Sequence, residues 1–114
     1  MEPIDCARKL VDVASDKQAA DILLLDIRHL GVFTDFFVIM TADNRRLMNA
    51  LQQDMVDVLK QAGTRLHHLE GTAESGWMLL DFGDVIVHLF APEERAYYRL
   101  EEVWSKGQQM VRIQ

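Results

Sequence analysis

The stretch from Gly76 to Ala91, GWMLLDFGDVIVHLFA, constrains the fold more than any other because it reads as a complete β-hairpin. Its two apolar runs flank Gly83-Asp84, and a two-residue loop at this point fixes how the two strands pair. The pairs predicted to share one face are Phe82–Val85, Leu80–Val87 and Met78–Leu89. All of these side chains are apolar, so this face has the character of an ordinary core face.

The opposite face of the hairpin is also largely apolar, although a strand face covered by water would be polar. Side chains alternate along a strand. This second hairpin face therefore consists of Trp77, Leu79, Asp81, Ile86, His88 and Phe90. Four large apolar groups need cover from a helix of the same chain or from another molecule. Which of the two supplies that cover decides the function.

Length and charge narrow the class of protein. A chain of 114 residues suits one domain, residues 1–114, with a substantial core. Its 18 acidic against 12 basic residues give a formal charge of -6, and no basic run offsets that balance. Such a chain repels phosphate backbones, so we expect no sequence-specific nucleic-acid binding and a basic protein surface as the better partner.

Cysteine usage and the start of the sequence indicate a compartment. Cys6 is the only cysteine, which excludes an internal disulfide framework and a multi-thiolate metal site. The first residues, MEPIDCARKL, are acidic where a leader would be basic, and no apolar run reaches membrane-spanning length. We expect a cytoplasmic protein without a membrane contact.

Hydrophobic periodicity predicts the remaining elements. The expected elements are a helix over 4–16, strands over 21–27 and 35–41, a helix from a cap at Asp43 or Asn44 to Gly63, a weak strand over 65–70, the hairpin, and a helix from Pro92 to about Lys106-Gly107. The short link between the first two strands favours an antiparallel pair. The tail after Trp104 carries no recognisable pattern.

The predicted order is α-β-β-α-β-β-β-α, which indicates an α/β (α+β) two-layer sandwich with a mixed five-stranded sheet. Three helices cannot easily cover both faces of five strands. We therefore expect the helices mainly on one face and much of the other face open.

Several motifs together resemble the ribosomal silencing factor family, also called the Iojap-related proteins. The matching pieces are Asp35-Phe36-Phe37-Val38-Ile39, Glu70-Gly71, Gly76-Trp77, Leu80 to Phe90 (LDFGDVIVHLF), and Arg95 with Tyr98, Leu100-Glu101 and Trp104. They occur in order from about Ala20 to Trp104. The chain departs from the family at Thr41-Ala42-Asp43-Asn44, where the family usually has a Ser-Gly-like turn.

The resemblance implies a fold related to the nucleotidyltransferases and a binding function. Family members dock on large-subunit ribosomal protein fourteen, on the face of the large ribosomal subunit that meets the small subunit. Docking there represses translation when nutrients are scarce, because the small subunit cannot join, or assists late assembly of the large subunit. Some members are homodimers.

The resemblance makes a partner the favoured cover for the second hairpin face, with a helix of the same chain as the alternative. The expected contact residues are Glu70, Trp77, Leu79, Asp81, Ile86, His88, Phe90 and Tyr98. Glu70 and Asp81, together with Glu101, would meet Lys or Arg of a basic partner and set orientation and association rate; otherwise they form a solvated rim. His88 is expected to hydrogen-bond in a partly buried site. Arg95 and Tyr98 are expected to pack the last helix onto the hairpin edge, with contact to the partner as the alternative.

The sequence contains no set of residues spaced for a known catalytic site, so we expect no catalytic residues, no metal and no cofactor. A nucleotidyltransferase needs a Gly-Ser turn and carboxylates that point the same way from a strand. No Gly-Ser pair exists, Asp81 and Asp84 are separated by the turn, and Asp21 and Asp26 lie at opposite ends of a strand. His67-His68 point in opposite directions. The alternatives are a degenerate nucleotidyltransferase-like domain that binds nucleotide with magnesium, and an apolar face that only forms a homodimer.

Overall fold

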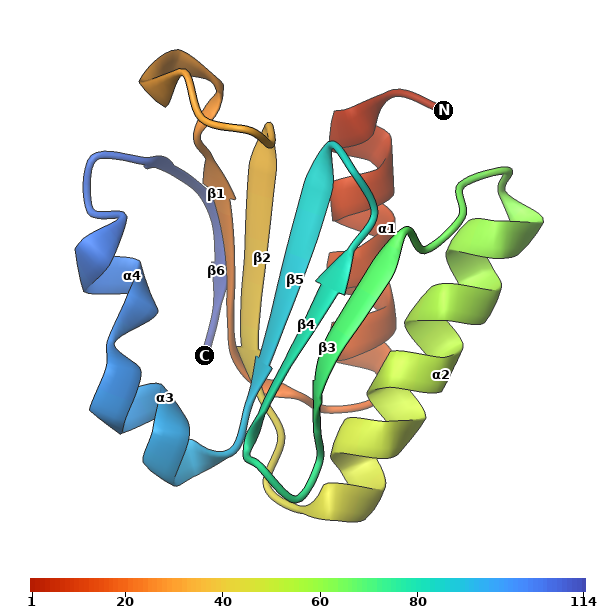
Figure 1. Cartoon of the computed structure of the whole chain (residues 1–114), viewed down its shortest axis with the longest axis vertical. Coiled ribbons are helices and arrows are strands. Elements are labelled where there is room, and N and C mark those ends of the chain that lie inside the picture. Colours follow the sequence, from red (N-terminus) through yellow and green to blue (C-terminus); the bar gives the residue numbers. More distant parts are fainter.

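Six strands form one mixed sheet that has helices on both faces (Figure 1). The computed structural model describes all of residues 1–114. The strand order is β3-β4-β5-β2-β1-β6. In chain order the elements are α1 (Pro3–Asp16), β1 (Ala20–Asp26), the 3₁₀ helix η1 (Arg28–Leu30), β2 (Phe36–Thr41), α2 (Arg45–Gln61), β3 (His68–Thr72), β4 (Trp77–Asp81), β5 (Val85–Phe90), α3 (Pro92–Tyr98), α4 (Leu100–Val103) and β6 (Gln108–Ile113).

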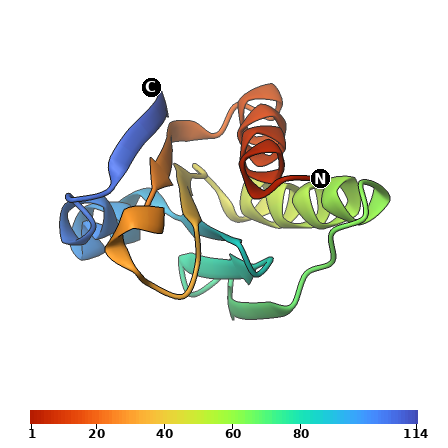
Figure 2. The same ribbon diagram turned by 90° about the horizontal axis from the view of Figure 1, so that it is seen from above.

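The two long helices, α1 and α2, lie on one face of the sheet (Figures 1 and 2). Each buries its apolar stripe there; Leu10 of α1 and Leu51 of α2, for example, have no exposed surface. At the start of α2 the side chain of Asn44 accepts a hydrogen bond of 2.8 Å from the N–H of Leu47. Asn44, rather than Asp43, is therefore the cap of this helix.

The hairpin has the predicted register. Leu80 pairs with Val87 and Met78 with Leu89, and the N–H of Phe82 donates to the carbonyl of Val85 at 2.9 Å across the loop. All six residues of the predicted core face are buried in the main core: Met78, Leu80, Phe82, Val85, Val87 and Leu89. The antiparallel pairing of β1 with β2 is also confirmed, and β2 pairs in parallel with β5.

The end of the chain differs from the prediction. A sixth strand, β6, pairs antiparallel with β1, so the sheet has one strand more than expected. The single helix expected after Pro92 is two short helices, because Arg99 adopts a left-handed conformation with φ 48° and breaks it. The weak strand expected over 65–70 is shifted toward the loop and spans His68–Thr72.

The α+β class and the mixed sheet are confirmed, but the second sheet face is less open than expected. The short helices α3 and α4 cross the second face, on the side opposite α1 and α2 (Figure 2). Leu100 and Trp104 pack there on a second core cluster, and the members of that cluster are Leu23, Leu25, Ile27, Phe37, Ile39, Ile86 and Phe90. Two side chains from this segment, Leu100 and Trp104, were too few to indicate a cover from the sequence, yet the cluster beneath them is buried.

Candidate partner-binding surface

The cover on the second face is incomplete, and it divides the expected contact residues into two groups. Ile86, His88 and Phe90 on β5 are buried, with exposed fractions of 3%, 5% and 0%. For these three the alternative of cover by the same chain is correct, and they do not reach a partner in this conformation. The accessible group is Glu70, Trp77, Leu79, Asp81 and Tyr98. We refer to these five residues as the β3–β4 strip.

Pairing of the two outer strands places the strip residues side by side. Glu70 lies opposite Leu79 and Thr72 opposite Trp77 in the antiparallel pair, so their side chains emerge on the same face. A hollow of about 230 Å³ lies between them, lined by Glu70, Gly71, Trp77 and Leu79. The strip therefore combines an acidic edge with a shallow apolar floor.

Trp77 is held in place by aromatic neighbours from two elements, β5 and α3. Its ring stacks on Phe90 at a centroid distance of 5.0 Å and lies 4.6 Å from the ring of Tyr98 on α3. Its indole N–H donates to Nδ1 of His88 at 3.2 Å. These contacts fix the orientation of the indole before any partner arrives, which lowers the entropy lost on binding. The sequence indicated each residue but not this aromatic cluster.

Two glycines of the family-like motifs let the backbone reach this position. Gly71 has φ +82°, and a Cβ atom there would collide with the backbone carbonyl of Trp77. Gly76 has φ +80°, and a Cβ atom there would overlap the side chain of Glu94 on α3. Only glycine adopts this backbone region without strain. Backbone geometry thus explains why glycine occupies its position in each of the motifs Glu70-Gly71 and Gly76-Trp77.

Asp81 serves the hairpin turn as well as the strip. Its Oδ1 atom accepts a hydrogen bond of 2.7 Å from the N–H of Gly83. One carboxylate oxygen of Asp81 is consequently committed to the turn. Glu70 also has one oxygen engaged, because its Oε1 atom lies 2.9 Å from Nε2 of His68, but its side chain remains 66% exposed.

His88 is a buried neutral side chain. Because an indole N–H can only donate, Nδ1 of His88 must accept, and the ring proton belongs on Nε2. Burial lowers the pKa of His88 from 6.5 to about 4. The Nε2 atom is buried without a hydrogen-bond partner, so protonation at Nδ1 would add a charge and remove the bond to Trp77.

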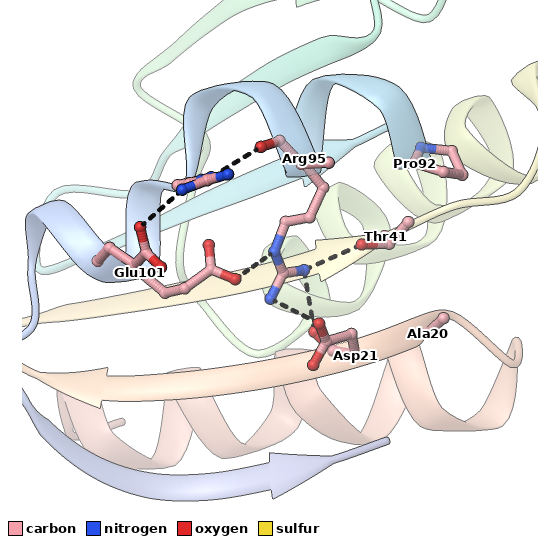
Figure 3. Close-up of a pocket in the computed structure, with 9 residues that line it drawn as sticks. Ala20, Asp21, Thr41, Pro92, Arg95 and Glu101 are labelled. Carbon is pink, nitrogen blue, oxygen red and sulfur yellow. Dashed lines mark hydrogen bonds and ion pairs between the residues drawn. The ribbon is translucent and has the colours of Figure 1, made fainter.

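Arg95 fastens α3 to the sheet (Figure 3). Its guanidinium donates to the hydroxyl of Thr41 and to the backbone carbonyl of Asp21, both at 3.0 Å, and to Oε2 of Glu101 at 2.9 Å. Asp21 is in turn 2.7 Å from Nη2 of Arg112 on β6. Arg95 therefore holds α3 against β1 and β2, and not against the hairpin edge as predicted. Glu101 pairs with Arg95 within the chain, although it was expected to meet a partner.

A hollow of about 480 Å³ lies beside this arginine and is lined by charged residues of both signs, among them Asp21, Arg95, Arg99, Glu101 and Glu102. Asp26, at the other end of β1, lies 2.6 Å from Arg28, and that hydrogen-bonded pair holds the pKa of Asp26 below its usual value.

No group of three or more His, Cys, Asp or Glu side chains is arranged to hold a metal ion. None of the helices has the length and apolar character needed to cross a membrane.

Comparison with known proteins agrees with the motifs. The family model described as "Ribosomal silencing factor during starvation" matches residues 1–114. Ribosomal silencing factor RsfS of Bacillus subtilis is 37% identical over 90 residues, which is 79% of this chain and 76% of that protein. A mouse protein named "Mitochondrial assembly of ribosomal large subunit protein 1" is 30% identical over 99 residues, 84% of this chain and 43% of the mouse protein.

The fold is shared with solved structures as well. A crystal structure of a Chromobacterium violaceum protein superimposes with a TM-score of 0.87 and 31% sequence identity, covering 100% of this chain and 94% of that one. With a family model that matches the whole sequence, the chain belongs to the ribosomal silencing factor family.

Proposed function

We propose that this protein binds the large ribosomal subunit at ribosomal protein fourteen and thereby prevents the small subunit from joining. Family membership carries the proposal, because the family is described by ribosomal silencing during starvation. The name of the mouse relative refers to assembly of the large subunit, and binding at the same place during late assembly is the second role that we assign. Both roles act by occupying a surface and require no chemistry.

The β3–β4 strip is the surface we assign to this contact. Trp77 and Leu79 are half-buried apolar groups at its centre, and Glu70 stands exposed beside them. A fixed tryptophan with an apolar neighbour is the usual core of an interface hot spot, and a flanking carboxylate favours approach of a basic ribosomal protein. Tyr98, 44% exposed, extends the strip onto α3.

The size of the protein is compatible with steric exclusion. A standard interface covers about 800 Å² on each partner, and the protein exposes 6376 Å² in total. Most of its surface therefore remains outside such an interface. A body of 32 × 32 × 24 Å on the joining face would keep the small subunit from approaching.

Sedimentation with purified subunits tests the proposal. Large subunits are incubated with the protein, small subunits are added, and the mixture is separated on a sucrose gradient. We expect the protein to migrate with the large subunit and the peak of joined ribosomes to fall in proportion to the protein added. Joining that is unaffected when the protein is in saturating excess would contradict the proposal.

Three variants locate the contact on the strip. We expect Trp77→Ala to weaken binding by about 2 kcal/mol, as for a central anchor, and Glu70→Lys to slow association by reversing a charge. Asp12→Lys makes the same charge change on the exposed side of α1, in the opposite layer, and should leave binding unchanged. Equal binding of Glu70→Lys and Asp12→Lys would remove the strip from the contact.

A further inference from the structure

The outer strand of the sheet suggests how a partner is held. We propose that the bound segment of the ribosomal protein is an extended, basic strand that pairs with the free edge of β3 and lengthens the six-stranded sheet. This inference rests on the proposed function and specifies the contact at the same surface. It identifies main-chain hydrogen bonds of β3 as a binding element, beside the side chains of the strip.

The edge of β3 is unpaired and unprotected. β3 is the terminal strand of the sheet and pairs only with β4. All five of its residues, from His68 to Thr72, are exposed. Sheets usually protect such an edge with charged side chains, above all lysine, with proline or with a covering helix. The sequence HLEGT contains no lysine and no proline, and its one charged side chain, Glu70, repels an acidic strand but not a basic one. The helices α3 and α4 lie over the other end of the face (Figure 1).

Charge selects a basic strand as the occupant. From His68 to Asp81 the chain carries Glu70, Glu74 and Asp81 and no Lys or Arg, a formal charge of -3. A strand added to β3 would place alternate side chains on the strip face next to Glu70, where Lys or Arg meets a carboxylate. The methylene groups of these lysine or arginine side chains would cover the hollow beside Trp77 and Leu79, because long basic side chains cover apolar surface in this way.

The opposite edge of the sheet does not suit the same occupant. The segment from Lys106 to the last residue, which contains β6, carries Lys106 and Arg112 and no acidic residue, a formal charge of +2. Its pairing with β1 also has a register irregularity between Leu24 and Leu25. Asp21 of β1 offsets the charge of Arg112 at 2.7 Å, but β6 has no carboxylate of its own to meet a basic strand, whereas β3 has Glu70. The two edges of one sheet provide an internal comparison.

Amide hydrogen exchange followed by NMR tests the inference directly. The isotope-labelled protein is studied alone and with purified ribosomal protein fourteen. We expect the outward amides of β3 to exchange at least tenfold more slowly in the complex, with cross-strand contacts to the partner, while β6 amides are unchanged. Three results would overturn the inference. The signals of the strip side chains could change while the β3 amides gain no protection, the β6 amides could be protected instead, or β3 could pair with a second copy of this chain in the complex.

Adjacent prolines provide a second test. Alternate amides of an edge strand point away from the sheet, so one of His68→Pro and Leu69→Pro removes an outward N–H and spares the pairing with β4. We expect that variant to fold and to lose at least tenfold in affinity, whereas the alanine at the same position loses less than threefold. Full affinity in both folded proline variants would overturn the inference; if neither folds, the exchange measurement decides.

The two proposals fail in different ways. Wild-type protein that does not sediment with large subunits would end the proposed function and this inference together. Wild-type protein that binds large subunits while the β3 amides remain unprotected would end only the inference.

Discussion

The indole N–H of Trp77 donates a 3.2 Å hydrogen bond to Nδ1 of His88, which links an accessible aromatic residue to a buried titratable one. His88 is deprotonated in the folded protein down to pH about 4 and in the unfolded chain down to about 6.5. The unfolded chain therefore takes up the extra proton between these values, and stability falls as pH falls through this window.

The first prediction concerns that pH window. His88 should make the free energy of unfolding about 2 kcal/mol smaller at pH 5 than at pH 7, from the linkage slope of about 1.4 kcal/mol per pH unit. His88→Gln keeps an acceptor for Trp77 but does not titrate, so its pH dependence should be correspondingly weaker. Urea unfolding of both proteins at the two pH values measures the difference. Parallel pH profiles would show that His88 does not titrate in this way.

A second prediction compares two glycines. Gly71→Ala should destabilise the protein more than Gly63→Ala, because both have positive φ (+82° and +94°) but only at Gly71 does a Cβ atom meet backbone, the carbonyl of Trp77. The backbone cost common to both is about 1–2 kcal/mol, so the excess at Gly71 measures the collision. Denaturant midpoints supply the comparison. Equal losses would mean that the backbone of β3 around Gly71 relaxes freely.

Arg95 is the subject of a third prediction. Arg95→Met should destabilise the protein by about 3 kcal/mol, because Asp21 and Glu101 lose a buried partner, and should raise amide exchange in α3 and α4. Arg99→Met is the matched control: its side chain is 70% exposed and 3.8 Å from Glu102, so a loss under about 1 kcal/mol is expected. Similar stability of the two variants would show that Arg95 does not fasten these helices.

The cap of α2 provides a fourth prediction. Asn44→Ala should cost about 1 kcal/mol, since the amide oxygen that accepts from Leu47 is lost. Asn49 is exposed within the same helix. Asn49→Ala should slightly stabilise the helix, because alanine has the higher helix propensity. Thermal unfolding distinguishes the two. A neutral Asn44→Ala would assign the cap to another group.

The parts of the fold governed by local chemistry were predictable from the sequence. Gly83-Asp84 fixed the hairpin register, because a two-residue loop allows only one pairing of the flanking strands. The stripes of α1 and α2 were equally readable, since their spacing is helical over three or more turns.

The parts that depend on distant contacts were not predictable. β6 is a strand because β1 offers it an edge, and its sequence QQMVRI has too little alternation to indicate that. Arg99 interrupts a helical pattern that continues on both sides of it. Exposure of the expected contact residues could not be predicted for the same reason: the alternation along β5 placed Ile86, His88 and Phe90 on the second face, but only the path of α3 and α4 determines that this part of the face is covered.

β4 has consequences for how this protein can change over evolutionary time. Met78 and Leu80 are buried in the main core together with residues of α1 and α2, while Trp77 and Leu79 alternate with them along the strand and belong to the strip. Even-numbered positions of this five-residue strand thus serve folding, and odd-numbered positions belong to the surface proposed for recognition. If the proposed contact holds, drift in the ribosomal partner can be matched at the odd positions while the even ones keep the interior unchanged.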